Sequence, residues 1–487
     1  MTFLSQEQLI KVLLAFNPWW TSAYVPRELN KPVRRVAFDE IKNALLHPTI
    51  RRAVFLSGAR RVGKTTLVYQ LIADLLQHRA NKNQILYISF DHPILKFFDM
   101  GEILSAFLNN IASQVNNELY LFFDEIHYAD NWDTWLKIIY DQNPSYRIMV
   151  TGSASPLLEN RASESGVGRW ITLKIPTLSF FEYLELIQAR DLPILQQNIQ
   201  PAWLHNLTRK ELADIMIRLS PLQSYFSRYL LIGGFPELVL SDDTVYAQRV
   251  LREDVADKVL KRDLTALFGT RNVIDLEKIF LFLCLYSGNI ISQDTIASEV
   301  GVSRQTVSNY LSIMEQANLI YISNPLEIAG KKILKSRPKI YIADVALRNA
   351  VLLLDESVFS DPVEMGMMIE TAVYKHVTSL YYASRPRIGY YRGRKNKEAD
   401  IVVALPGGRI VIEVKYREDT TLGRDEAIIE LANLDDTLGA VLVTKNIDDF
   451  GPADYNTRIP IVKMPAFAFL YLLGYAERQS QNGSLRK

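Results

Sequence analysis

The chain has 487 residues, of which 48% are hydrophobic and 22% are charged. These are values of a globular protein, and at about 150 residues per domain the length predicts roughly three domains. The formal net charge of +1 neither requires nor excludes a polyanionic partner, because local patches can still be basic. The single cysteine, Cys284, excludes a disulfide framework and fits a reducing compartment. With no recognisable signal peptide and no apolar run long enough to span a bilayer, the sequence predicts a cytoplasmic protein without a membrane partner.

Residues 1–50 are predicted to be a mostly helical N-terminal segment, to which the sequence assigns no chemistry. From residue 51 to residue 176, short apolar runs alternate with helical patterns, which is typical of an α/β domain with a parallel sheet covered on both faces. Ligands of such sheets bind at the carboxyl ends of the strands. The predicted strands are residues 53–56, 85–90, 119–125, 147–151 and 170–175.

A glycine-rich loop follows the first predicted strand and precedes an amphipathic helical pattern. It reads G-x-x-x-x-G-K-T, a pattern that cradles phosphates with backbone N–H groups at a helix N-terminus. Lys64 can reach the β- and γ-phosphates, and the Thr65 hydroxyl can bind Mg²⁺. The alternative is a chance match in a glycine-containing turn, which the strand and helix context disfavours. The residues predicted to bind ATP here are Gly58, Ala59, Arg60, Arg61, Val62, Gly63, Lys64, Thr65 and Thr66.

Two adjacent carboxylates end the third predicted strand. Asp124 is placed to hold Mg²⁺ opposite Thr65, and Glu125 is placed to orient or deprotonate an attacking water. A base beside the metal ligand favours hydrolysis over simple nucleotide holding. The alternative is a helix cap or a solvated turn at the end of a strand.

The next two strands add further candidates for the ATP site. After the fourth strand, Thr151 or Ser153 can touch the γ-phosphate or the water, and the spacing does not choose between them. Before the fifth strand, Arg169 can act as an arginine finger toward a neighbouring subunit of a homo-oligomer, or it can form a surface salt bridge. Arg161 is a weaker candidate for the finger.

These motifs resemble the AAA+-type ATPases of archaea and bacteria that carry a characteristic C-terminal domain. The resemblance extends to Pro176-Thr-Leu-Ser-Phe-Phe-Glu182 and to Gly233-Gly234-Phe235-Pro236-Glu237, and it covers most of the chain beyond residue 50. It implies Walker A and Walker B motifs in a P-loop domain, ATP and Mg²⁺ as cofactors, and a helical lid over residues 177–270. The two glycines are either a hinge after the lid or a turn.

Residues 271–337 are predicted to form a winged helix-turn-helix. A helix over residues 294–300, a turn at 301–303 and a second helix over 304–315 have the required order. The spacing turns Val307, Leu311 and Met314 inward.

The outward residues of the second helix are types that read base edges and phosphates, namely Arg304, Gln305, Ser308 and Asn309. A basic run is predicted to form or flank the wing and to contact phosphates; it comprises Lys331, Lys332, Lys335, Arg337 and Lys339. The alternative is a module that serves only for packing.

From residue 338 to residue 487 the pattern changes again. Two apolar runs flank a Pro-Gly-Gly turn and are predicted to pair as a hairpin. The two-residue period of a strand puts Glu413 and Lys415 on one face, and Asp400 lies at the start of the partner strand. Two carboxylates that hold a divalent metal beside a lysine form a phosphodiesterase-like set, to which a helical Glu370 can add a ligand.

This constellation resembles the PD-(D/E)xK nuclease superfamily, with Ala399 in place of the usual proline. The resemblance implies that Asp400, Glu413 and Lys415 are catalytic and that Glu370, Asp400 and Glu413 bind the metal. The alternative is a nuclease-like fold retained for binding or assembly, with an ion-paired strand face. Basic and aromatic residues just before the motif suit a nucleic-acid backbone and exposed bases; they are Arg385, Arg387, Tyr390, Tyr391, Arg392, Arg394, Lys395 and Lys397.

The sequence thus predicts an ATPase that couples Mg²⁺-dependent ATP hydrolysis to the binding or processing of nucleic acid, with DNA as the expected partner. Lys64, Glu125 and Arg169 would serve the hydrolysis. The C-terminal domain would be a metal-dependent nuclease or a DNA-binding relic. The competing prediction is a nucleotide-switched regulatory ATPase whose C-terminal domain is an inactive binding or assembly module.

Overall fold

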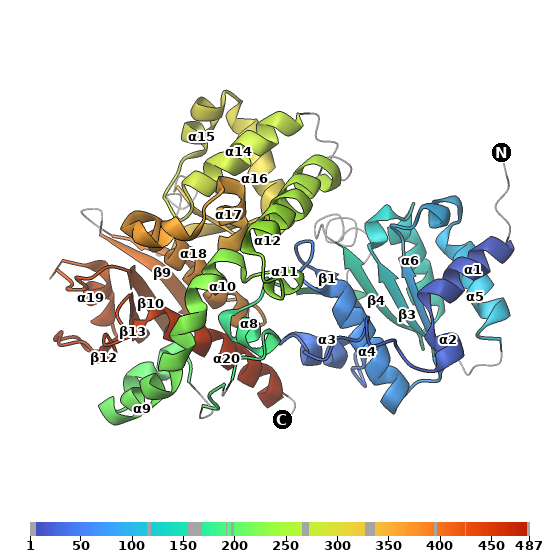
Figure 1. Ribbon diagram of the computed structural model, residues 1–487, viewed down its shortest axis with the longest axis horizontal. Helices are drawn as coiled ribbons and strands as arrows, with labels where there is room; N and C mark the ends of the chain where they lie inside the picture. The colour runs from blue at the N-terminus through green and yellow to red at the C-terminus, as the bar shows by residue number, and fades with distance from the viewer. Residues whose placement is uncertain are drawn as a thin grey trace. The chain divides into compact units, whose positions relative to one another are not determined.

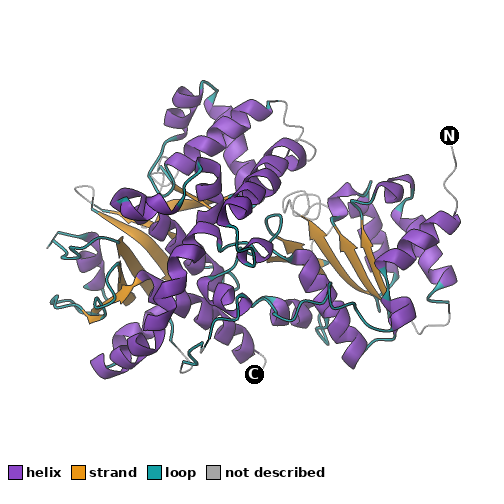
Figure 2. Cartoon of the chain, viewed as in Figure 1, coloured by secondary structure: helices purple, strands orange, loops and turns teal. Residues whose placement is uncertain are grey.

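The computed structural model describes residues 6–113, 118–152, 168–190, 192–195, 199–264, 272–326, 337–393, 397–423 and 425–484. The chain divides into two compact units, Met1–Pro176 and Thr177–Lys487 (Figure 1). Each unit has its own sheet, and Figure 2 shows the strands of each enclosed by helices. In the described ranges no helix is long and apolar enough to cross a membrane.

The first unit contains a five-stranded sheet in the order β2-β3-β4-β1-β5. Every neighbouring pair is parallel, which confirms the predicted parallel sheet. The first three strands are buried along their whole length, because helices cover them and no alternation with polar residues is needed. The strands are β1 (Ala53–Ser57), β2 (Ile85–Ser89), β3 (Tyr120–Asp124), β4 (Arg147–Gly152) and β5 (Trp170–Lys174).

The N-terminal segment packs on the edge of this sheet. The side-chain amide of Asn17 donates to the carbonyl oxygen of Tyr87 (2.9 Å) and accepts from its N–H (2.7 Å). The indole of Trp20 donates to the carbonyl oxygen of Ile85 (2.8 Å). These contacts occupy backbone groups of the edge strand β2, which would otherwise be open to pairing with another chain. The helices of this unit are α1 (Gln6–Phe16), α2 (Trp19–Ser22), α3 (Phe38–Leu45), α4 (Lys64–His78), α5 (Met100–Asn110) and α6 (Trp132–Gln142).

The second unit contains an eight-stranded sheet in the order β12-β13-β11-β10-β9-β8-β6-β7. The predicted hairpin is present: β9 and β10 pair antiparallel, and Gly407 in the turn has a φ of 88°. The strands are β6 (Ile320–Leu326), β7 (Lys339–Ile342), β8 (Arg387–Arg392), β9 (Glu398–Leu405), β10 (Gly408–Lys415), β11 (Thr437–Thr444), β12 (Gly451–Pro452) and β13 (Ile461–Pro465).

The helices of the second unit come from residues both before and after its strands in the chain. After residue 251, the backbone is π-helical over Arg252–Asp257 and Val259–Asp263. The α-helices are α8 (Phe180–Leu186), α9 (Arg209–Leu219), α10 (Phe226–Ile232), α11 (Pro236–Val239), α12 (Thr244–Leu251), α14 (Val273–Leu285), α15 (Gln293–Val300), α16 (Arg304–Gln316), α17 (Val345–Leu352), α18 (Pro362–Leu380), α19 (Ala427–Ala432) and α20 (Ala466–Ser484).

Two helices at the predicted positions, α15 and α16, are followed by the antiparallel strands β6 and β7. Val307, Leu311 and Met314 are buried, as the spacing predicts. Strand β6 also pairs in parallel with β8, so the hairpin is part of the same sheet as β9 and β10. The segments that the sequence treats as two separate domains therefore share one sheet.

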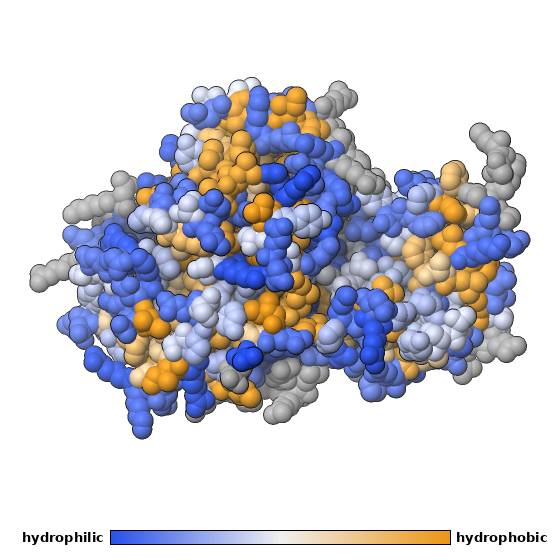
Figure 3. All heavy atoms as spheres, viewed as in Figure 1, coloured by the Kyte–Doolittle hydropathy of each residue, from blue (hydrophilic) through white to orange (hydrophobic). Residues whose placement is uncertain are grey.

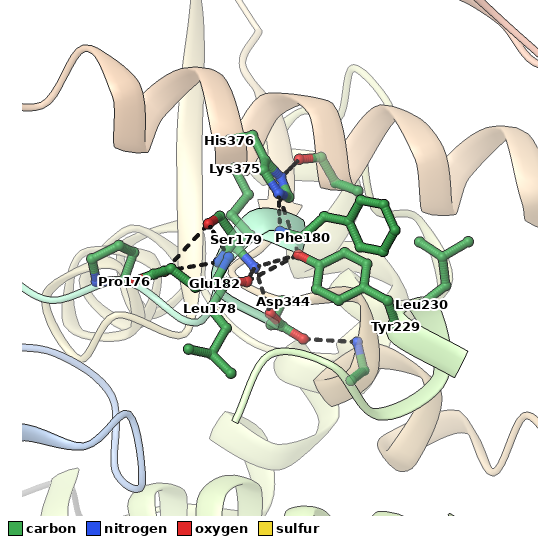
Figure 4. Close-up of polar contacts among 12 residues, drawn as sticks. Pro176, Leu178, Ser179, Phe180, Glu182, Tyr229, Leu230, Asp344, Lys375 and His376 are labelled. Carbon is green, nitrogen blue, oxygen red and sulfur yellow. Dashed lines mark hydrogen bonds and ion pairs between the residues drawn. The ribbon is translucent and has the colours of Figure 1, made fainter. Parts of the chain in front are cut away.

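A buried polar network fixes the first residues of the second unit (Figure 4). The ammonium of Lys375, on α18, donates to the carbonyl oxygen of Leu178 (2.5 Å) and to the Tyr229 hydroxyl (3.0 Å). It also pairs with the carboxylate of Asp344 (3.1 Å). A Cβ at Gly234 would collide with this carboxylate, so the second glycine of the Gly-Gly pair permits a close approach inside the unit.

His376, the next residue along α18, joins the same network. Its Nε2 accepts from the N–H of Phe180 (2.9 Å), and its Nδ1 donates to the carbonyl oxygen of Ala372 (2.7 Å). This pattern requires a neutral imidazole that carries its proton on Nδ1. Burial, followed by the charge of the neighbouring Lys375 ammonium, lowers the pKa of His376 to about 3.

Candidate functional site

The glycine-rich loop lies between the end of β1 and the start of α4. A Cβ at Gly58 would approach the carbonyl oxygen of Ile175 to 2.4 Å, so the loop can pack against the chain after β5 only with glycine there. Gly63 has a φ of 93°, a left-handed conformation that glycine adopts without strain. The α4 N-terminus, with its unsatisfied N–H groups, follows directly.

Lys64 is buried at the first position of α4. Its ammonium donates to the carbonyl oxygens of Gly58 (2.8 Å) and Ala59 (3.0 Å), which belong to the loop itself. The cation is therefore held over the loop, where an anion bound by the loop N–H groups would meet it.

Asp124 accepts hydrogen bonds from three hydroxyl groups at the carboxyl edge of the sheet. Thr65 donates to one carboxylate oxygen (2.7 Å), and Tyr87 donates to the same oxygen (2.9 Å). Thr151, at the end of β4, donates to the other oxygen. The structure thus brings Thr65, Asp124 and Thr151 together, and the oxygen donors of Thr65 and Asp124 suit the hard cation Mg²⁺.

Glu125 leaves β3 in the left-handed conformation, with a φ of 49°. Its N–H donates to the Thr151 hydroxyl (3.2 Å), and its carboxylate lies 3.4 Å from Nδ1 of His127. A non-glycine residue in this conformation is a strained position of the kind that occurs at functional sites. Its side chain is 20% exposed, so it is partly open to solvent beside the buried Asp124.

Arg169 lies at the opposite edge of the sheet. Its carbonyl oxygen accepts from the N–H of Ala53, at the amino end of β1, whereas the loop follows the carboxyl end. Its guanidinium binds both carboxylate oxygens of Asp141, on α6, at 2.8 and 3.0 Å. This is the surface salt bridge that the sequence left as an alternative; a finger toward another subunit stays a prediction. Ser153 and Arg161 lie outside the described residues.

Sequence reasoning missed two partners of this site. The guanidinium of Arg35 donates to the carbonyl oxygen of Val62, in the loop (2.7 Å), and to that of Pro176 (2.9 Å). Arg35 stands far from the motif in the chain, and no local pattern marks it. Tyr87 is similarly distant, and burial followed by the negative charge of Asp124 raises the pKa of its hydroxyl well above the ordinary value. The only sign of its role in the sequence was a tyrosine hydroxyl in the middle of an apolar strand.

The second candidate site is a cluster of charges in the second unit, formed by the residues of the predicted nuclease motif and their partners. The Lys415 ammonium pairs with Glu413 (2.8 Å) and Glu426 (3.5 Å). One carboxylate oxygen of Asp400 accepts from the N–H of Val414 (2.9 Å). Asp400, Glu413 and Lys415 therefore converge, as their positions in the hairpin predict.

Glu370, on α18, joins the cluster through an ion pair with a lysine. The Lys339 ammonium pairs with Glu370 (2.9 Å), Glu398 (2.7 Å) and Asp400 (3.1 Å). The Tyr341 hydroxyl also donates to Glu370 (2.7 Å). Lys339 was predicted to contact phosphates as part of a basic wing; this is wrong, because its side chain is 3% exposed and ion-paired with three carboxylates.

The protonation of the cluster follows from its burial. Burial, followed by the charge of Asp400, raises the pKa of Glu413 to about 8 and that of Glu370 to about 7. For Lys339, burial disfavours the charged form, but the carboxylates of Asp400, Glu370 and Glu398 outweigh it and raise its pKa well above the ordinary value. Among the described residues, no group of three or more His, Cys, Asp or Glu side chains is arranged to hold a metal ion.

The predicted nucleic-acid residues of α16 are at the surface. Arg304 is exposed and lies 3.6 Å from the carboxylate of Asp294, and Gln305 donates to the side chain of Asn309 (2.9 Å). The surface nearby is not uniformly basic, since hydrophobic residues gather over α14 in Figure 3. There Ile274, Leu281 and Leu285 are 63%, 45% and 50% exposed.

Basic residues before β9 have partners that limit their predicted role. Arg392 is exposed on β8, opposite Glu398. Lys397 pairs with Glu430 (3.2 Å) and Asp425 (3.5 Å). Tyr390 is 1% exposed, so the prediction that it stacks on exposed bases is wrong. Four of the predicted residues, Lys331, Lys332, Arg394 and Lys395, lie outside the described ranges, as does Lys335.

Comparison with known families finds a match for the part of the chain that contains the first of these sites. Residues 50–184 match the family described as "AAA domain". This part of the chain is therefore similar to a P-loop ATPase domain of the AAA type. Residues 223–358 and 365–464 match two domains of unknown function, DUF8612 and DUF4143, which assign no activity to the second unit.

Relatives of similar length carry no assigned function. The uncharacterized protein MJ1544 of Methanocaldococcus jannaschii is 26% identical over 419 residues, which cover 84% of this chain and 86% of that protein. An uncharacterized protein of Haemophilus influenzae is 26% identical over 322 residues, which cover 65% of this chain and 73% of that one.

Among solved structures, the Aeropyrum pernix ORC1 protein in complex with DNA is 14% identical, with a TM-score of 0.28 over 68% of this chain and 95% of that chain. AMPPCP-bound DnaA from Aquifex aeolicus is 15% identical, with a TM-score of 0.25 over 62% of this chain and 92% of that chain. Likenesses at such TM-scores have no functional weight.

Proposed function

We propose that the chain hydrolyses ATP in a Mg²⁺-dependent reaction at the glycine-rich loop. The hydrogen bond between Thr65 and Asp124 (2.7 Å) carries this proposal, because it joins the end of the loop to the end of β3 in the arrangement that P-loop hydrolases use for the metal. Bound Mg²⁺ would neutralise charge on the β- and γ-phosphates. Lys64 would bind the phosphates, and Glu125 would orient the attacking water.

Thr151 is the better supported of the two small polar candidates. Its hydroxyl contacts both Asp124 and the N–H of Glu125, so it can pass a change at the phosphate to the residue that holds the water. Ser153 stays a prediction. Arg169 would act in hydrolysis only in a homo-oligomer, after release from Asp141.

We infer that ATP hydrolysis is coupled to nucleic acid, with DNA as the expected partner. Support comes from the exposed polar face of α16, which carries Arg304, Gln305 and Asn309. Helix α15 precedes α16 in the order of a helix-turn-helix. Side chains of these types read base edges and phosphates. The winged helix and the nuclease-like fold are proposals for the second unit, and β6, β7 and the β9–β10 hairpin are consistent with both.

ATP turnover with and without nucleic acid tests this function. We expect Mg²⁺-dependent turnover that rises when single-stranded DNA, duplex DNA or RNA is added, and binding that weakens in Arg304→Ala. Because a phosphate contact depends on salt, binding should also fall as salt rises. Turnover that no nucleic acid changes would contradict the coupling, and an absence of turnover in any condition would contradict the ATPase proposal itself.

Two roles remain for the C-terminal part of the second unit. A metal-dependent nuclease would use Asp400, Glu413 and Lys415, and it requires cleavage of DNA with Mg²⁺ or Mn²⁺ that is lost in Asp400→Asn. The second candidate is a binding or assembly module that cuts nothing and responds to the nucleotide state. The ion pairs of Lys339 favour the second candidate, because they already occupy carboxylate oxygens of Glu370 and Asp400 that a metal would need.

A further inference from the structure

Lys339 is fixed in place by its backbone as well as by its charge. It is the first residue of β7, where it pairs with Ser323 of β6 on one side and forms an isolated bridge with Ile290 on the other. Its ammonium also lies 5.8 Å from the centre of the Tyr390 ring. The side chain is thus directed into the cluster from a strand held on both edges.

The three carboxylates around Lys339 come from separate elements. Glu370 belongs to α18, and Glu398 and Asp400 belong to β9, all within 3.1 Å of the ammonium nitrogen. Three carboxylate oxygen atoms therefore surround this one buried ammonium group.

The oxygen atoms that a metal would require are engaged. Asp400 gives one oxygen to Lys339 and the other to the N–H of Val414. Glu413 gives one oxygen to Lys415 and accepts weakly from the N–H of Asp400 (3.4 Å) through the other. A divalent cation between Asp400, Glu413 and Glu370 would stand beside two ammonium groups in a buried setting, where repulsion between like charges is poorly screened.

We propose that the Lys339 ammonium is the resident cation of this site and takes the position that a divalent metal holds in a nuclease. A metal does not fit the cluster while Lys339 is there. The lysine links β7 to α18 and β9 by charge, in addition to the pairing of β6 with β8. The β6–β7 hairpin is thereby held firmly to the rest of the sheet. Such rigidity suits a module that binds and does not cut.

Mn²⁺ binding by the full, nucleotide-free chain tests this inference. Unbound Mn²⁺ is counted by its electron paramagnetic resonance signal, in wild type and in Asp400→Asn. We expect the two proteins to bind the same amount of Mn²⁺, because the cluster binds none. One Mn²⁺ per chain that is present in wild type and lost in Asp400→Asn would overturn the proposal, whether or not other variants fold.

The isosteric neutral variant Lys339→Met supplies the converse test. We expect it to gain one Mn²⁺ per chain, to lose it again in Lys339→Met/Asp400→Asn, and to unfold at a higher temperature when Mn²⁺ is added. Lys397→Met is the matched control, since Lys397 also bridges two carboxylates but near the surface, and it should gain none. A folded Lys339→Met chain that gains no Mn²⁺ site would overturn the claim that the lysine takes a metal's position.

This inference deepens the second candidate function and rests on it. The Mn²⁺ assay contains neither nucleotide nor DNA, so its failure is separate from a failure of the ATPase proposal. An absence of ATP turnover would leave the Mn²⁺ result intact, and a Mn²⁺ site in wild type would leave ATP turnover intact.

Discussion

Two of the buried lysines each begin an element, Lys64 at the start of α4 and Lys339 at the start of β7, but their surroundings differ. Lys64 donates to two backbone carbonyl oxygens of its own loop, whereas Lys339 is paired with three carboxylates. Carbonyl oxygens are neutral acceptors, so Lys64 can turn from them to a phosphate without leaving a buried charge behind. If Lys339 left its partners, three carboxylates would stay in the interior without a cation to compensate their charge.

The acidic residues show the same contrast. Asp124 is surrounded by the hydroxyls of Thr65, Tyr87 and Thr151, which are neutral and can reorient toward a metal ligand shell. Asp400 is bound to a lysine and to a backbone N–H. Converging charged residues therefore indicate chemistry only where they are not already ion-paired with each other.

The largest expected effect is the loss of stability in Lys339→Met. Removing one partner from a buried charge cluster leaves the others uncompensated, which costs about 3–5 kcal/mol. We expect urea unfolding of the second unit to shift to lower urea by a corresponding amount, while ATP turnover per folded chain is retained. The surface control Lys397→Met should change the free energy of unfolding far less, because its ion pairs are solvated and screened. Equal, small effects of both variants would show that the Lys339 ion pairs stabilise the unit no more than those of a surface lysine.

Lys64→Ala should have the opposite profile. The loss of the ammonium that meets the phosphates should lower ATP turnover by about 10²-fold or more, because a preorganised charge at the reacting group is removed. The melting temperature should stay close to that of wild type, because the carbonyl oxygens of Gly58 and Ala59 that the ammonium leaves behind are neutral. The exposed Lys11→Ala variant, on α1, should keep full turnover. Wild-type turnover in Lys64→Ala would refute the assignment of the loop.

Acid should destabilise the second unit through His376. Its pKa is about 3 in the folded chain, against an ordinary value near 6.5, so the unfolded chain binds more protons between these values. The stability that the neutral ring contributes is therefore complete above about pH 6.5 and is lost as the pH falls; at pH 5 the loss is about 2 kcal/mol. Urea unfolding at pH 7 and pH 5 measures it.

In His376→Gln the difference between pH 7 and pH 5 should shrink by that amount, whereas the exposed His78→Gln should behave as wild type. An unchanged pH dependence in His376→Gln would show that the ring is not held neutral by its contacts with Phe180 and Ala372.

The smallest expected effect is that of Arg35→Ala. The variant loses two charge-assisted hydrogen bonds, to the loop at Val62 and to the chain after β5 at Pro176, so the loop should hold ATP less well. A charged hydrogen bond of about 1.5 kcal/mol corresponds to about a tenfold change. We expect kcat/KM for ATP to fall about tenfold, mostly through KM, and the exposed Arg27→Ala to have no effect. An unchanged KM would show that Arg35 does not support ATP binding by the loop.

Local patterns predicted much of the first unit. The five strands of the first sheet, the loop and the convergence of Thr65 with Asp124 follow from periodicity and from parallel strands that end at one edge. Arg35 and Tyr87 could not be found in this way, because their contacts join residues far apart in the chain.

The C-terminal cluster shows where such reasoning fails. The motif predicted that Asp400, Glu413 and Lys415 lie together, and they do. Nothing in the motif predicted Lys339, which stands next to a basic run and was interpreted as part of it. Its one signal was the apolar strand that it opens, Ile340-Tyr341-Ile342, since a lysine in a buried strand needs acidic partners. Tyr390 was misread for a similar reason, because alternation along a strand does not say which face is buried.

The central claim is that the glycine-rich loop and the end of β3 form a site that hydrolyses ATP. It is tested most directly by Mg²⁺-ATP turnover in Glu125→Gln, with ATP binding measured on the same protein. We expect turnover to fall by about 10²-fold or more while ATP still binds, because the amide can contact the water but cannot take its proton. The exposed Asp130→Asn variant should match wild type. Wild-type turnover in Glu125→Gln would contradict the claim.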